Sequence, residues 1–65
     1  MNWDQIEGRW KEVRGKARES WGELTDDELD QIAGKKDQMI GKLQTKYGIT
    51  KEEAEQRAND WAAKL

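Results

Sequence analysis

The sequence predicts an all-α domain, and three observations carry this prediction. Apolar residues recur three or four positions apart over most of the chain, which is the spacing of one face of an α-helix. Two Thr-x-x-Glu sequences have the spacing of helix N-terminal capping boxes. Glycines stand where the apolar stripes stop, and there is no proline. We therefore predict one domain over residues 1–65, built as a small bundle of four helical segments.

The first predicted helix runs from about Trp3 to Trp21. Asn2 or Asp4 can cap its start, and Gly22 stands where a left-handed residue commonly ends a helix. Its apolar stripe consists of Trp3, Ile6, Trp10, Val13, Ala17, Trp21 and Leu24.

Three further helical segments are expected. The second starts after the capping sequence Thr25–Glu28 and is interrupted near Gly34; the third ends at Gly48; and the last starts after Thr50–Glu53, which repeats the capping arrangement. Their apolar positions are Leu29 and Ile32, then Met39, Ile40, Leu43 and Tyr47, then Ala54, Ala58, Trp61 and Leu65.

The two halves of the chain echo each other. Each consists of a long helix, a glycine stop, a capped start and another helix, which predicts two similar α-hairpins packed across a shared core. Trp10, Trp21 and Trp61 lie on the apolar stripes and are predicted to belong to this core. Trp3 lies in the first turn of its helix, so it is the best candidate for a partly exposed aromatic side chain.

The composition argues against an enzyme. The 65 residues include no histidine and no cysteine, which removes the commonest general base, the thiolate nucleophile and the usual zinc ligands. Asp26, Asp27, Glu28 and Asp30 fit helix N-terminal acids better than a metal site. We expect no catalytic residue, metal or cofactor. No apolar run approaches the ~20 residues that span a bilayer and no signal-peptide pattern begins the chain, so we expect a cytoplasmic protein with no membrane partner.

The charges are abundant but balanced, with 12 basic against 14 acidic side chains. One flank of the third helical segment is nevertheless basic, because Lys35, Lys42 and Lys46 lie along it and could follow phosphates. Together with Arg14 and Arg18 these lysines form a candidate surface for weak, non-specific nucleic-acid binding. The acidic block around residues 23–30 favours instead an ordinary solvated helix surface.

Three glycines lie nearly opposite the apolar stripes: Gly8, Gly15 and Gly41. Each costs about 0.5–1 kcal/mol relative to alanine inside a helix. A partner helix or ligand lying along them, another helix of the same domain, or a merely tolerated cost would each explain them. With Trp3 they form a candidate interaction surface for an unknown macromolecule, or for a second copy of the chain. Both a monomer and a weak homodimer therefore remain open.

The chain also resembles a known family over nearly its whole length. The resemblance is carried by Trp10-Lys11, Gly15-Lys16, Trp21-Gly22-x-Leu24-Thr25-Asp26-Asp27-x-Leu29, Ile32-x-Gly34-Lys35-x-Asp37, Gly41-Lys42, Tyr47-Gly48, Glu53-Ala54-Glu55 and Trp61. In these positions it is similar to the CsbD-like family. The resemblance implies a small soluble bacterial protein that becomes abundant under general stress, with two crossed α-hairpins in a SAM-domain-like arrangement, and it implies no reaction.

The leading hypothesis from the sequence is therefore a non-enzymatic, stress-associated protein that contacts another macromolecule through a helical surface. Weak nucleic-acid binding is the alternative.

Overall fold

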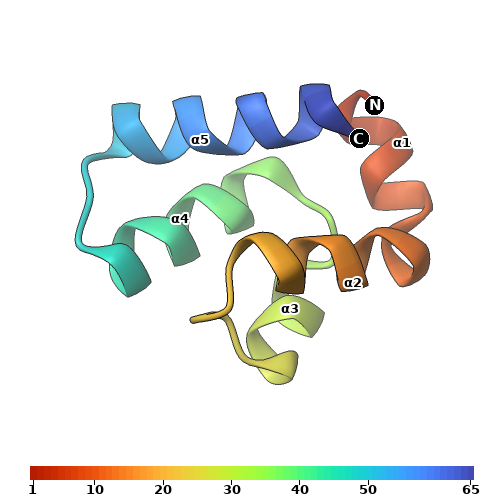
Figure 1. Ribbon diagram of the computed structural model, residues 1–65, viewed down its shortest axis with the longest axis horizontal. Coiled ribbons are helices and arrows are strands. Elements are labelled where there is room, and N and C mark those ends of the chain that lie inside the picture. The colour runs from red at the N-terminus through yellow and green to blue at the C-terminus, as the bar shows by residue number, and fades with distance from the viewer.

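The computed structural model describes residues 1–65 and confirms an all-α fold, with five helices and no strand. The helices are α1 (Trp3–Gly8), α2 (Trp10–Ser20), α3 (Asp26–Ile32), α4 (Lys36–Tyr47) and α5 (Lys51–Lys64). Helices α4 and α5 run side by side in opposite directions, while α1, α2 and α3 close the rest of the core (Figure 1). The two ends of the chain meet, and the Met1 amino group donates a hydrogen bond to the carbonyl oxygen of Ala62 at 3.0 Å.

The prediction of four segments is wrong because the long first helix is broken in two. The break lies at Arg9, whose backbone leaves the helical region with φ −115° and ψ 25°. The apolar residues before and after Arg9 pack against different helices. Trp3 packs against α5, whereas the Trp10 indole Nε1 donates to the Leu29 carbonyl oxygen of α3 at 2.9 Å. A single straight helix would not bring both indoles to these partners.

The predicted capping sequences form at the starts of α3 and α5. At α3 the box is reciprocal: the Glu28 amide donates to Thr25 Oγ1 at 3.2 Å, and the Thr25 amide donates to Glu28 Oε1 at 3.0 Å. At α5 only half of the box is present. The Glu53 amide donates to Thr50 Oγ1 at 3.1 Å, but the Glu53 carboxylate accepts from Arg57 at 2.9 Å instead.

The remaining helix ends confirm the predicted roles of Asn2 and Gly48 and contradict that of Gly22. Asn2, one of the two predicted caps, accepts a hydrogen bond at the start of α1. Gly48 ends α4 with φ 62°, as predicted. The prediction for Gly22 is wrong, because α2 ends at Ser20 with Trp21 as its C-cap at φ −129°, and Gly22 does not adopt a positive φ.

Gly34 follows the end of α3 and lies against α1. Ala33 and Gly34 both have positive φ, of 50° and 80°, and so turn the chain sharply between α3 and α4. A Cβ atom on Gly34 would lie 2.7 Å from the Glu7 Cα and 3.0 Å from the Ile6 carbonyl oxygen. The interruption predicted here is thus a turn between two helices, and only glycine fits its contact with α1.

The core draws on all five helices and contains no buried polar side chain. Trp21 and Trp61 are 7% exposed, with ring centroids 4.9 Å apart, which confirms their predicted place in the core. Trp10, also predicted to belong to the core, is only half-buried at its edge, as is Trp3. The buried apolar residues are Ile6, Val13, Ala17, Trp21, Leu24, Leu29, Ile32, Met39, Ile40, Leu43, Ala54, Ala58, Trp61 and Ala62. No large hydrophobic side chain is exposed, so the exterior is polar.

Candidate interaction surfaces

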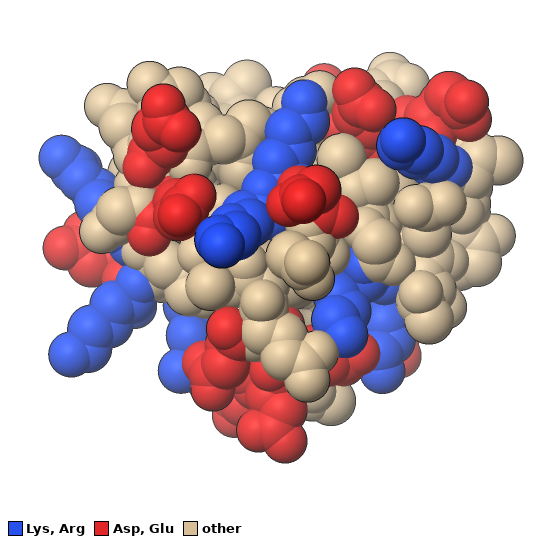
Figure 2. Space-filling model, turned by 180° about the vertical axis from the view of Figure 1, so that it is seen from behind, with Lys and Arg blue, Asp and Glu red and all other residues tan.

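The five basic residues of the candidate strip belong to two separate rows, one on α2 and one along α4. Arg14 and Arg18 lie on α2, whereas Lys42 and Lys46 lie on α4 and Lys35 precedes it. Acidic side chains gather over α3, at the lower edge of Figure 2, with basic side chains on either side. The structure therefore does not join the five residues into one strip.

Carboxylates of α3 hold the basic side chains on both of its flanks. Arg14 Nη2 lies 3.5 Å from a carboxylate oxygen of Asp26 and 3.5 Å from one of Asp30. Arg18 also pairs with Asp26. Lys46 Nζ, on the other flank, lies 3.0 Å from Glu28 Oε1. Much of the predicted positive charge is thus paired within the fold.

Glu28 is the most strongly perturbed acid of the chain. Its carboxylate accepts from the Thr25 amide and pairs with the Lys46 ammonium. The backbone hydrogen bond from Thr25, followed by the hydrogen bond from Lys46, lowers the pKa of Glu28 from 4.5 to about 2. Both partners stabilise the ionised form. The carboxylate therefore has a structural role, fixing the start of α3 and its flank toward α4.

A groove of about 370 Å³ lies between α2 and α3. Its lining consists of Lys11, Arg14, Gly15, Arg18, Asp26 and Leu29. Two independent predictions meet here, since Arg14 and Arg18 come from the basic candidates and Gly15 from the glycine candidates. Sequence reasoning missed Lys11. Its spacing of three and seven residues from Arg14 and Arg18 places all three on one flank of α2 and could have revealed it.

The glycines of the candidate interaction surface are open to solvent. A Cβ atom on Gly8, Gly15 or Gly41 would have no other group of the protein within 4 Å. The explanation that another helix of the same domain packs against them is therefore wrong. They lie on α1, α2 and α4 respectively, and not on one continuous stripe.

Trp3 is half-buried, which agrees with its prediction as the partly exposed indole. Its Nε1 donates to Asn59 Oδ1 at 3.1 Å, and its ring centroid lies 6.2 Å from that of Trp61. The exposed part of the ring lines a second groove, of about 490 Å³, between α1, the start of α4 and α5. Trp3 thus lies in a different groove from Gly15.

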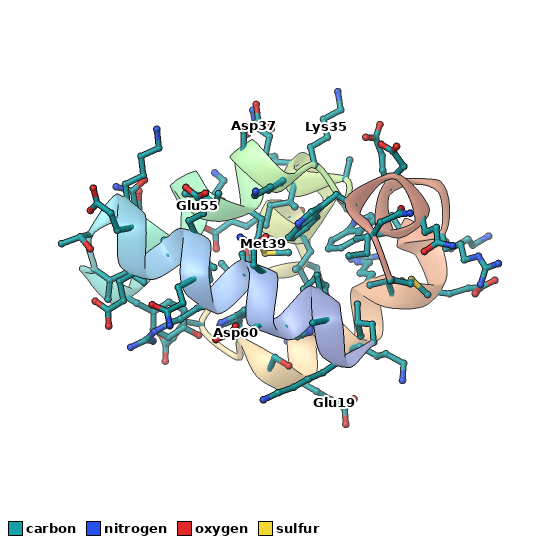
Figure 3. All side chains as sticks on the ribbon, turned by 90° about the horizontal axis from the view of Figure 1, so that it is seen from above. Glu19, Lys35, Asp37, Met39, Glu55 and Asp60 are labelled. Atoms are coloured by element: carbon teal, nitrogen blue, oxygen red, sulfur yellow. The ribbon has the colours of Figure 1, made fainter.

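This second groove has the opposite charge balance. Figure 3 shows Lys35 and Asp37 on the α4 side and Glu55 on α5, with Met39 beneath them in the core. Lys36 Nζ lies 3.9 Å from Glu55 Oε1. The charged lining residues are Asp4, Glu7, Lys35, Lys36, Asp37 and Glu55. With four acids and two lysines, it does not suit a polyanion.

Two further features of residues 1–65 concern metals and membranes. No three acidic residues lie close enough together to hold a metal ion. None of the five helices combines the length and the apolar character that crossing a bilayer requires.

The fold and its surfaces define a small all-helical protein with an apolar core and an exterior that carries several ion pairs. The chain belongs to the CsbD-like family, whose model matches residues 4–56. This confirms the resemblance seen in the sequence.

Bacterial relatives agree with this assignment. A UPF0337 protein of Nitrosomonas europaea is 56% identical over 62 residues, which cover 95% of this chain and 66% of the relative. A UPF0337 protein of Pectobacterium atrosepticum is 52% identical over 61 residues, covering 94% of this chain and 88% of the relative. The UPF0337 protein YjbJ of Escherichia coli K12 is 49% identical over 61 residues, with the same coverage of 94% and 88%.

Proposed function

We propose that this chain is a non-enzymatic, stress-associated protein of the bacterial cytoplasm that acts through contact between its helical surface and another macromolecule. The family to which it belongs is associated with stress responses, which supports the physiological part of the proposal. The SAM-domain-like crossing of two α-hairpins belongs to the same proposal. The packing of α2 against α3 and of α4 against α5 supports it.

The open helix glycines carry the proposal that the protein acts by contact. Gly15 and Gly41 lie in the interiors of α2 and α4, where alanine would stabilise the helix. A Cβ atom at Gly15 or Gly41 would have no other protein group within 4 Å. A Cβ atom at Gly34, in contrast, would collide with the backbone of α1. A partner that approaches the helix backbone closely would explain both positions, because any side chain there would hold it away.

The experiment compares the wild type with Gly15→Ala and Gly41→Ala. Each tagged protein is recovered from stressed and unstressed cells, with and without nuclease treatment, and the bound macromolecules are identified. We expect a stress-dependent partner that is lost from at least one variant although both variants are more stable than the wild type. The gain in stability excludes misfolding as the cause. Equal recovery by all three proteins would contradict the proposal, as would the absence of any partner.

Nucleic-acid binding is the second candidate function, and the observation that favours it is the row of three cations along α2 beside Gly15. Binding through phosphate contacts falls steeply as salt is raised. The absence of any shift with single-stranded or duplex DNA at low salt would remove this candidate.

Self-association is tested by sedimentation, because the same open glycines can face a second copy of the chain. A species that stays monomeric at high concentration would leave another macromolecule as the partner.

A further inference from the structure

The groove between α2 and α3 combines a row of cations with an open stretch of helix backbone. Lys11, Arg14 and Arg18 lie along one flank of α2, and Gly15 lines the same groove. Seven residues of helix, at ~1.5 Å each, separate the first cation from the last by roughly 10 Å. One strand of B-form DNA carries a phosphate every ~3.4 Å along the axis, and the row is long enough to contact more than one of them.

We propose that the α2–α3 groove binds the phosphate backbone of a nucleic acid, and that Asp26 and Asp30 are built-in competitors for its arginines. This inference rests on the second candidate function. It assigns the contact to α2 and not to the lysines of α4, and it adds Lys11 to the contacting residues.

Gly15 gives a polyanion close access to the helix. A Cβ atom at this position would have no neighbour within 4 Å, so the backbone between the cations is uncovered. A phosphate can therefore approach the helix surface while the longer side chains of Lys11 and Arg18 reach it from either side. Guanidinium groups also suit phosphate oxygens, because their donors form paired hydrogen bonds in one plane.

The carboxylates that pair with the two arginines are exposed to solvent, although Asp26 also accepts a hydrogen bond from Arg18. The side chains of Asp26 and Asp30 are 66% and 63% exposed, and each lies 3.5 Å from Arg14. Exposed ion pairs of this kind are weak and are screened by salt. A phosphate can therefore replace a carboxylate at the guanidinium group without disturbing the core.

The competition sets the strength of binding. Three cations (Lys11, Arg14, Arg18) against two carboxylates (Asp26, Asp30) leave a local charge of only +1. A ligand with a charge on every repeating unit engages all three cations at once, whereas an acidic peptide presents its carboxylates less regularly. The wild type is therefore expected to bind nucleic acid weakly and only at low salt.

The test measures fluorescence anisotropy of labelled single-stranded and duplex DNA at about 50 mM and about 200 mM salt. The double variant Asp26→Asn/Asp30→Asn is expected to bind about tenfold more tightly than the wild type, because both negative charges that pair with Arg14 are removed. Arg14→Gln/Arg18→Gln is expected to bind more weakly and to lose about 2 from the salt-dependence slope. Lys35→Gln/Lys42→Gln makes the same charge change at and just before α4, outside the α2–α3 groove, and is expected to retain the wild-type slope. Circular dichroism verifies that all variants are folded.

The outcomes separate the groove from the broader candidate function. Binding that depends equally on the Arg14/Arg18 and Lys35/Lys42 pairs would overturn the groove while leaving nucleic-acid binding in place. No binding by any protein, including the Asp26→Asn/Asp30→Asn variant, would overturn both. Displacement of the DNA by polyglutamate as effectively as by unlabelled DNA would show a site for acidic protein segments and contradict the assignment to phosphate.

Discussion

Replacing Gly34 by alanine is the perturbation whose effect follows most directly from the structure. Its backbone has φ 80°, a conformation that costs a residue with a Cβ atom roughly 1–2 kcal/mol. The new Cβ would also lie 2.7 Å from the Glu7 Cα, well inside the ~3.5–4.0 Å of an ordinary carbon contact, and such overpacking costs about 1–3 kcal/mol. The sum of about 2–5 kcal/mol is a large part of the ~3–10 kcal/mol expected for a domain of this size.

Urea and thermal unfolding followed by tryptophan fluorescence measure this effect. One kcal/mol shifts the Tm of so small a domain by about 4–8 °C, so Gly34→Ala should lower the Tm by roughly 8 °C or more. Gly15→Ala is the matched control, because its Cβ meets no neighbour and the helix gains about 0.5–1 kcal/mol. A Gly34→Ala protein as stable as the wild type, or a Gly15→Ala protein that is less stable, would refute the reasoning about these glycines.

Three further predictions test individual contacts. The pKa of Glu28 is lowered in the folded state, so the ionised carboxylate stabilises the fold above pH 4.5 and this stabilisation is lost as the pH falls toward about 2. Glu28→Gln should therefore remove the change of the urea midpoint over this pH range. Trp10→Phe deletes the hydrogen bond to the Leu29 carbonyl and should cost about 1 kcal/mol in urea unfolding, whereas an unchanged midpoint would show that this bond contributes nothing. Thr25→Ala removes the cap of α3 and should cost about 1 kcal/mol, with earlier amide exchange in α3; unchanged exchange there would contradict the capping role.

Local features of the fold could be predicted from the sequence because they depend on near neighbours in the chain. The cap at Thr25 is an example, since both of its partners lie within three residues. The membership of Trp21 and Trp61 in the core followed from helical periodicity. The break at Arg9 could not be predicted in this way. A continuous stripe shows which side chains are buried, but not that Trp3 and Trp10 must reach different helices.

For the candidate site, too, the sequence predicted the residues themselves but not which of them lie close together in the fold. The sequence identified the basic residues and the open glycines, but it grouped Arg14 and Arg18 with the lysines of α4. Pairing of these arginines with Asp26 and Asp30 joins positions 8 to 16 residues apart across a turn, and no periodicity encodes it. The two rows of positive charge therefore became visible only in the fold.

Photo-crosslinking in living cells tests most directly whether the open helix faces contact a partner. Glu19 and Thr45 are exposed and lie one helical turn from Gly15 and Gly41, while Asp60 is an exposed control on α5. A photoreactive amino acid is placed at each position in turn, and cells are irradiated with and without stress. We expect stress-dependent adducts of defined mass from position 19, position 45 or both, and none from position 60. No adduct from position 19 or 45, or adducts formed equally from all three positions, would show that these helix faces do not form the contact.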